Sequence, residues 1–351
     1  MPESMHGGDI YSYEREYGEK PLDFSSNINP LRMQKAVLAA LCEAAIHADC
    51  YPDPHSTSLC RKLAQFEQVA QDWVLCSGGA ADLIYRIVYA YRPKRALLLA
   101  PSFSEYEAAL RAGKCRIQFA RLEATEQFQL TEAFLEELTS GYDILFLCNP
   151  NNPTGQIIPA NLMEKIVKKC RENQILLVVD ECFLDFSEHF QELTVKKYLQ
   201  NNPYLIVLKA FTKTFALAGA RLGYILCSNR DLLEQIAAAG QPWPVSTLAQ
   251  AAGEAALQNA AEYLEKTRKY LKREREFLRY GLTCCGYKVF ESHANYLFFL
   301  AQDTQLVQKM RQEGILIRGC ENYRGLGPGY YRIAIRRHED NIKLLGAFER
   351  I

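Results

Sequence analysis

The chain has 351 residues, of which 48% are hydrophobic and 23% are charged, and its 41 basic side chains balance its 41 acidic ones. This composition is typical of a soluble globular protein with one large domain and a smaller one. A formal net charge of zero gives no overall attraction to nucleic acid or to an anionic membrane. Any site for an anion must therefore be local.

The 12 cysteines include no Cys-x-x-Cys pair. A disulfide framework or a zinc site would show close pairs, so we expect reduced thiols, no bound metal and a cytoplasmic location. The segment Met1–Lys20 is polar and charged, which argues against a signal peptide. No apolar run reaches the roughly 18 residues that a membrane span needs, so no membrane partner is expected.

Between about residues 55 and 230, short apolar runs alternate with segments of helical periodicity. The predicted strands are Trp73–Cys76, Ala96–Leu99, Arg116–Phe119, Ile144–Leu147, Ile175–Val179, Leu205–Leu208 and Gly223–Cys227. The predicted helices between them include Ala80–Tyr91, Ser104–Ala112, Glu132–Leu138 and Asn161–Glu172. Strands separated by helices in this order predict a doubly wound, mostly parallel sheet.

The C-terminal third has a different pattern, which begins with a long amphipathic helix predicted over Thr247–Tyr280. Short strands and two helices follow, at Lys288–Phe290, Tyr296–Leu300, Tyr331–Ile335, Thr304–Glu313 and Glu339–Glu349. These elements predict a second, smaller α/β layer. Residues 1–45 are expected to form an arm or to join this small domain, with a large domain over 46–240 and the long helix and small domain over 241–351.

Lys213 lies in the segment Phe211–Tyr224, between two threonines and before small and apolar residues. Apolar surroundings disfavour the ammonium, so the pKa of the amine falls and it becomes a nucleophile that can form a Schiff base with an aldehyde. Thr212, Thr214 and Arg221 suit an anionic group nearby. The alternative is a lysine whose stem packs on apolar neighbours while its charge stays in water.

Two polar groups follow predicted buried strands. Asp180 ends the run Ile175–Val179, and the turn Asn149–Gly155 follows Ile144–Leu147. Open α/β sheets bind ligands at the carboxyl ends of their strands, where an aspartate can pair with a protonated pyridine nitrogen. Two prolines and a glycine fix the turn, which can hold an asparagine amide toward a ligand oxygen. The alternatives are a capping aspartate and a purely structural turn.

Two further loops follow predicted strands. The small residues of Ser77–Ala81 let backbone amides approach a phosphate at the start of a helix. In the loop Pro101–Tyr106, either Phe103 or Tyr106 can stack on a flat ring. Packing inside the protein is the alternative for both loops.

The order and spacing of Asn152-Pro-Thr-Gly, Asp180-Glu181, Lys213 and Arg221 resemble the fold-type I pyridoxal-phosphate enzymes, the aspartate aminotransferase superfamily, over nearly the whole chain. The resemblance implies that Lys213 holds the cofactor as a Schiff base, that Asp180 pairs with its pyridinium and that Arg221 binds its phosphate. The residues expected around the cofactor are Gly79, Ala80, Ala81, Phe103, Asn152, Asp180, Thr212, Lys213 and Arg221. A homodimer is also implied, because Tyr51 resembles a tyrosine that reaches the cofactor phosphate of the partner subunit.

Two positions depart from the pattern of that superfamily. Ala210 stands three positions before the lysine, where a hydroxyl residue is usual, and Thr212 would supply the hydroxyl instead. Phe183 stands three positions after Asp180, where many aminotransferases have a tyrosine. The second departure argues against a generic aminotransferase.

Within the superfamily the chain is similar to histidinol-phosphate aminotransferases and to the threonine-phosphate decarboxylases of cobalamin synthesis. The features that favour the decarboxylases are His6-Gly7-Gly8, Asp23–Pro30 and Phe183. The substrate-binding residues that this resemblance implies are His6, Gly7, Asn27, Asn152, Arg318 and Arg332. The alternatives are a disordered terminal histidine and solvated arginines.

We therefore expect a pyridoxal-phosphate-dependent lyase that converts L-threonine O-3-phosphate to (R)-1-aminopropan-2-ol O-2-phosphate, with Lys213 and Asp180 as catalytic residues. A histidinol-phosphate aminotransferase, a decarboxylase of L-serine O-phosphate and a non-catalytic regulator of the same fold are the alternatives. Decarboxylation and amino transfer differ in which bond at Cα stands perpendicular to the cofactor ring, and the sequence does not determine that torsion.

Overall fold

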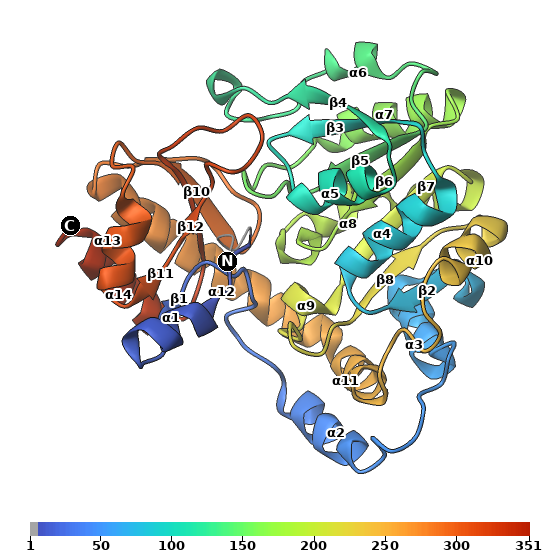
Figure 1. Cartoon of the computed structure of the whole chain (residues 1–351), viewed down its shortest axis with the longest axis horizontal. Helices are drawn as coiled ribbons and strands as arrows, with labels where there is room; N and C mark the ends of the chain where they lie inside the picture. Colours follow the sequence, from blue (N-terminus) through green and yellow to red (C-terminus); the bar gives the residue numbers. More distant parts are fainter. Residues whose placement is uncertain (1–5) are drawn as a thin grey trace.

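The computed structural model describes residues 6–351. Its largest feature is a seven-stranded sheet with the strand order β2-β8-β7-β6-β5-β3-β4 (Figure 1). The strands are β2 (Val74–Ser77), β3 (Arg95–Ala100), β4 (Arg116–Arg121), β5 (Ile144–Cys148), β6 (Leu176–Asp180), β7 (Leu205–Ala210) and β8 (Gly223–Leu226). All neighbours are parallel except β8, which runs antiparallel to both β7 and β2. The predicted doubly wound, mostly parallel sheet is thus confirmed.

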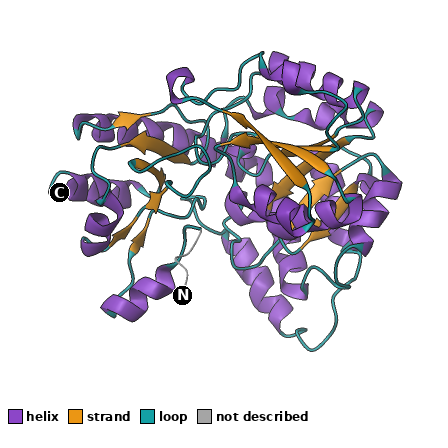
Figure 2. Cartoon of the chain, turned by 45° about the horizontal axis from the view of Figure 1, so that its top comes forward, coloured by secondary structure: helices purple, strands orange, loops and turns teal. Residues whose placement is uncertain are grey.

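Helices cover both faces of this sheet (Figure 2). Those on one face are α4 (Ala80–Tyr91), α5 (Ser104–Ala112) and α10 (Arg230–Ala238). Those on the other are α3 (Thr57–Glu67), α7 (Ala160–Glu172) and α11 (Thr247–Gln258). Side chains alternate along a strand, so Val178 and Asp180 of β6 point to the first face, whereas Val179 points to the second.

A smaller layer lies beside the large sheet (Figure 1). It contains an antiparallel sheet of order β12-β13-β10-β9 and the separate parallel pair β1-β11. Its strands are β1 (Leu22–Asp23), β9 (Lys288–Val289), β10 (Tyr296–Leu300), β11 (Ile315–Leu316), β12 (Arg318–Gly319) and β13 (Tyr330–Ala334). Its helices include α1 (Ile10–Tyr17), α13 (Leu306–Gln312) and α14 (His338–Phe348). The pairing of β1 with β11 joins the N-terminal segment to this layer.

Several helices differ from the prediction. The long helix is in fact two helices, α11 and α12 (Ala260–Cys284), which meet at Asn259, where the backbone leaves helical geometry at φ −123° and ψ 29°. The helix expected over Glu132–Leu138 is shortened to α6 (Phe134–Glu137). The remaining short elements are α8 (Phe190–Leu193), α9 (Phe211–Thr214), η1 (Gln71–Trp73), η2 (Ala124–Glu126), η3 (Leu184–Phe186) and η4 (Val195–Asn201). Across residues 6–351, every helix is too short or too polar to cross a bilayer.

The N-terminal 45 residues do not behave as one piece. Whereas β1 pairs within the small layer, α2 (Lys35–Ala45) packs against α11, and its Val37 is buried in the core behind the large sheet. Residues 1–45 were expected to form an arm or to join the small domain, and α2 instead packs against α11, because its apolar side finds a partner in that alanine-rich helix. The domain limits near residues 45 and 240 remain a prediction.

Candidate active site

A cavity of about 370 Å³ lies at one edge of the large sheet. Because β2, β3, β5, β6 and β7 run in the same direction, their carboxyl ends and the loops that follow them meet at this edge. The large sheet and its loops contribute Ala80, Ala81, Phe103, Asn152, Asp180, Thr212, Lys213 and Arg221. The N-terminal segment and the small layer contribute His6, Gly7, Asn27, Arg318 and Arg332. The fold thus gathers predicted side chains from both ends of the chain.

Two predicted residues lie outside this lining. Gly79 stands behind it, where a Cβ atom would come within 3.1 Å of the Arg221 guanidinium, and its φ of +104° favours glycine. Tyr51 lies on the surface with its side chain 79% exposed, and its ring stacks on Trp243 with the centroids 4.5 Å apart. Tyr51 therefore contributes nothing to the cavity of its own chain.

Lys213 lies in α9, the short helix that directly follows β7. Burial and then the positive charge of Arg332 lower the pKa of the Lys213 amine to about 8. An amine with this pKa is partly neutral near neutral pH, and the neutral form is the nucleophile. The structure thus supplies the apolar setting from which nucleophilic character was inferred.

Asp180 is the last residue of β6 and is only 4% exposed. Its Oδ1 accepts a hydrogen bond from the Cys182 backbone N–H at 2.9 Å, and its Oδ2 accepts one from the Tyr106 hydroxyl at 2.6 Å. Burial raises the pKa of Asp180, and these hydrogen bonds oppose that rise. Since the opposing groups are donors rather than basic side chains, a protonated ring nitrogen would supply the cation that a buried carboxylate needs.

Arg332 of β13 connects Asn152 to the N-terminal segment. Its Nη1 donates to Asn152 Oδ1, which also accepts from the Tyr323 hydroxyl at 3.3 Å, and its Nη2 donates to the Ser25 carbonyl at 2.9 Å. The buried Nε of Arg332 and the buried Oδ1 of Asn27 have no hydrogen-bond partner within residues 6–351. Buried polar atoms are nearly always paired. These two atoms, on residues that line the cavity, can therefore each form a hydrogen bond to a polar ligand.

The N-terminal segment closes one side of the cavity. The Gly8 N–H donates to Ser25 Oγ at 2.7 Å. A Cβ atom on Gly7 would lie 2.2 Å from the Ser25 carbonyl oxygen, so this close approach requires glycine. His6 Nε2 lies 2.8 Å from Glu105 Oε1 of α5. These contacts hold the imidazole at the cavity wall, and its role toward a substrate phosphate stays a prediction.

Several lining residues were not predicted: Ser25, Ser26, Glu105, Cys148, Cys182 and Tyr323. Glu105 lies inside the loop Pro101–Tyr106, for which the sequence predicts an aromatic contact with the ligand, so a place for this carboxylate near the site could have been predicted. Tyr323 had no such signal, because it follows a two-residue strand and enters the cavity only through the fold of the small layer. Of the two aromatic candidates, Phe103 lines the cavity, whereas Tyr106 lies behind it.

Comparisons with known proteins agree with this architecture. The family model described as aminotransferase class I and II matches residues 19–348. The threonine-phosphate decarboxylase of Salmonella typhimurium is 37% identical over 99% of this chain and 96% of that protein. Two crystal structures also match, a histidinol-phosphate aminotransferase from Clostridium acetobutylicum (TM-score 0.87, 27% identity) and L-threonine-O-3-phosphate decarboxylase from Porphyromonas gingivalis (TM-score 0.83, 25% identity). Each match covers 94% of this chain and 98% of the other. The chain therefore belongs to the class I and II aminotransferase family.

Proposed function

We propose that this chain is a pyridoxal-phosphate-dependent lyase that converts L-threonine O-3-phosphate to (R)-1-aminopropan-2-ol O-2-phosphate and carbon dioxide in cobalamin synthesis. The observation that carries the proposal is the arrangement of charge in one cavity: Lys213 and Asp180 come from the large sheet, and His6, Arg318 and Arg332 come from the N-terminal segment and the small layer. The 37% identity with the Salmonella decarboxylase supports the same choice.

The residues of the cavity fit pyridoxal phosphate. The N-terminus of α4 and the Arg221 guanidinium offer donors to a phosphate. Phe103 offers a ring face, and the buried Asp180 carboxylate offers a partner for a protonated ring nitrogen. Lys213 would hold the aldehyde carbon. When bound, the cofactor supplies a conjugated ring that accepts the electron pair released at the substrate Cα.

The remaining cations suit a substrate with two anionic groups. We propose that Arg332, with its unpaired Nε, binds the carboxylate and that His6, Asn27 and Arg318 bind the phosphate. A substrate fixed at its amine and at its phosphate has little freedom to rotate about Cα. Anchoring the phosphate in this way would hold the substrate in an orientation that favours loss of carbon dioxide over loss of the Cα proton.

Lys213 has two tasks in this proposal. It would hold the cofactor aldehyde until a substrate amine takes its place, and its amine would then lie in the same cavity as the substrate Cα. Having taken up the proton of the incoming substrate amine, the Lys213 ammonium would give a proton to Cα after carbon dioxide has left. A pKa of about 8 suits a group that must both carry and release a proton near neutral pH.

We expect the purified protein, loaded with pyridoxal phosphate, to release carbon dioxide from phosphothreonine. Phosphoserine lacks one methyl group and is expected to react more slowly, by roughly 10- to 200-fold, because a small apolar contact is worth about 1–3 kcal/mol. The measurement is capture of labelled carbon dioxide from carboxyl-labelled substrate. If none is released and the protein instead transfers an amino group from histidinol phosphate to 2-oxoglutarate, the aminotransferase alternative holds.

We also propose that the protein is a cytoplasmic homodimer in which Tyr51 reaches the cofactor phosphate of the partner subunit. The support is the set of exposed apolar side chains on the described residues, which includes the stacked pair Tyr51 and Trp243 and, in and just after α2, Leu38 and Ile46 at 52% and 73% exposure. Free thiols at all 12 cysteines suit a reducing compartment. Sedimentation equilibrium is expected to give twice the chain mass of 40.0 kDa. A monomer at micromolar concentration would contradict the dimer.

A further inference from the structure

A tyrosine outside the cavity holds the carboxylate of Asp180. Tyr106 of α5 is fully buried at 0% exposure, and its hydroxyl donates to Asp180 Oδ2 at 2.6 Å. Its ring stacks on Phe146 of β5, with the centroids 5.1 Å apart and the planes at 14°, and meets Phe103 edge-on at 5.5 Å. Packing on two sides holds the hydroxyl between the Asp180 carboxylate and the Cys148 thiol.

The arrangement follows from the alternation of side chains along the sheet. Asp180 points to the face of β6 that also carries Val178, and α5 packs on that face. Tyr106 belongs to the same apolar core and is not among the residues that line the cavity. It therefore touches Asp180 from behind, where no substrate atom can reach it.

The other titratable groups that face Asp180 are Cys148, Cys182 and Tyr296. Burial raises the pKa of each of these groups, so they stay uncharged. Cys182 donates its backbone N–H to Oδ1 and its thiol also hydrogen-bonds to the carboxylate, whereas Tyr106 donates its hydroxyl to Oδ2. Burial also raises the pKa of Tyr106 itself, so its hydroxyl keeps the proton that it donates.

We propose that Tyr106 is a positioning residue, which orients the Asp180 carboxylate toward the ring nitrogen of the cofactor and stabilises its negative charge there. The inference rests on the proposed function, because it assumes that pyridoxal phosphate binds in the cavity. A donor to the charged form of a buried carboxylate favours that form. Without the hydroxyl, Asp180 takes the proton from the ring nitrogen more readily, and the ring becomes a weaker acceptor of electrons.

The test is a pH titration of the visible absorbance of holoenzyme that carries Tyr106→Phe. A ring nitrogen without its proton withdraws fewer electrons from the nitrogen that joins Lys213 to the cofactor. That nitrogen then keeps its own proton to higher pH. The midpoint of the absorbance titration is therefore expected to rise by about one pH unit. The same change should lower kcat by about tenfold with KM unchanged, because the substrate does not touch Tyr106.

Tyr224→Phe is the matched control. The Tyr224 hydroxyl is also buried and donates to a carboxylate, Glu67 Oε1 at 2.5 Å, but on the opposite face of the sheet. Its removal should leave the midpoint in place. In an Asp180→Asn background, Tyr106→Phe should cause no further shift, because the two changes act through one contact.

Three results would overturn the inference. They are an unchanged midpoint in Tyr106→Phe, an equal shift in Tyr224→Phe, and a full shift of Tyr106→Phe in the Asp180→Asn background. A different result distinguishes failure of the proposed function: unmodified protein mixed with pyridoxal phosphate would then show no visible band that titrates. Circular dichroism of each variant confirms that the ring of phenylalanine has preserved the packing.

Discussion

Lys213→Ala protein is expected to release carbon dioxide from phosphothreonine at least about 10³-fold more slowly than the unmodified protein. Alanine can neither hold the aldehyde carbon nor move a proton at Cα. Both tasks depend on the amine that burial and the charge of Arg332 bring to a pKa of about 8. The variant should still bind cofactor and substrate, since the groups proposed to hold their phosphates are untouched. The measurement is the rate of carbon dioxide release.

Lys165→Ala is the control for this variant. Lys165 lies on the surface and pairs with Glu132 at 2.6 Å, so its loss should leave the rate unchanged. A small primary amine added to Lys213→Ala protein should restore part of the rate, because it can carry the missing proton. If Lys213→Ala protein instead supported full biological activity in cells, the non-catalytic regulator would become the better interpretation.

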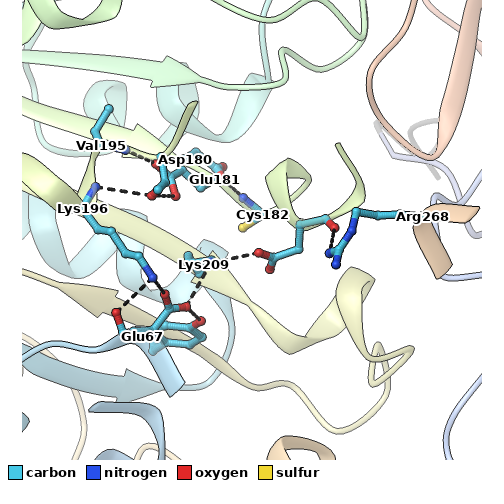
Figure 3. A network of polar contacts seen from close by, with 11 residues as sticks. Glu67, Asp180, Glu181, Cys182, Val195, Lys196, Lys209 and Arg268 are labelled. Atoms are coloured by element: carbon cyan, nitrogen blue, oxygen red, sulfur yellow. Dashed lines mark hydrogen bonds and ion pairs between the residues drawn. The ribbon is translucent and has the colours of Figure 1, made fainter. Parts of the chain in front are cut away.

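Lys209→Met is expected to destabilise the protein by about 3–5 kcal/mol, because it removes one partner from a buried ion pair. Lys209 Nζ lies 2.9 Å from Glu67 Oε1 (Figure 3) and 3.1 Å from Asp185 Oδ1. All three side chains are buried. Lys196 Nζ approaches the other Glu67 oxygen at 3.0 Å. Loss of the central cation would leave two buried carboxylates without their closest countercharge.

The pKa shifts of Glu67 and Lys209 reflect the same attraction between the buried lysine and its carboxylates. Burial would raise the pKa of Glu67, but Lys209 and Lys196 lower it to about 2. Burial would lower the pKa of Lys209, but Asp185, Glu67 and Glu181 raise it above its usual value. Glu67 therefore contributes stability that is present above its unfolded pKa and is lost as the pH falls through about 2.

The pH dependence of the free energy of unfolding distinguishes loss of the Lys209 charge from loss of the packing of its side chain. In Lys209→Met protein the carboxylates can neutralise themselves by taking up protons, so the deficit in the free energy of unfolding should be smaller near pH 5 than near pH 7. Lys196→Met removes a lysine that is 30% exposed and should cost less at both values. Denaturant unfolding at the two pH values is the measurement. A deficit that does not change with pH would contradict the role of charge.

Much of the large sheet could be predicted because its strands are buried on both faces. All residues of β5 and β6 are buried, and such unbroken apolar runs between helical segments are typical of parallel strands. Asp180 stood out for the same reason, as the first charged residue after a buried run. Lys213 and Asn152 followed neighbouring runs, so their meeting at one edge was a consequence of the predicted topology.

Side-chain contacts between a helix and the strand that it covers could not be predicted from the sequence pattern. The sequence indicates that Tyr106 is an aromatic residue near the site. Its hydrogen bond to Asp180 depends on which face of the large sheet α5 covers and on which side chains of β6 point to that face. The pairing of Lys209 with Glu67 depends in the same way on α3. The break at Asn259 carries neither proline nor glycine, so the helical periodicity runs through it without a visible stop.

The one antiparallel strand of the large sheet has a mechanical consequence. Since β8 runs back along β7, the connection between these two strands keeps both Lys213 and Arg221 at the edge where the cavity lies, and the Phe211 N–H donates to the Leu222 carbonyl at 3.1 Å. The amine and the guanidinium are thus held by one continuous connection, residues 211–222. We expect the separation of these two groups to limit the length of a molecule that can contact both. Insertion of one residue into the connection would change this separation and leave every side chain of the cavity in the sequence.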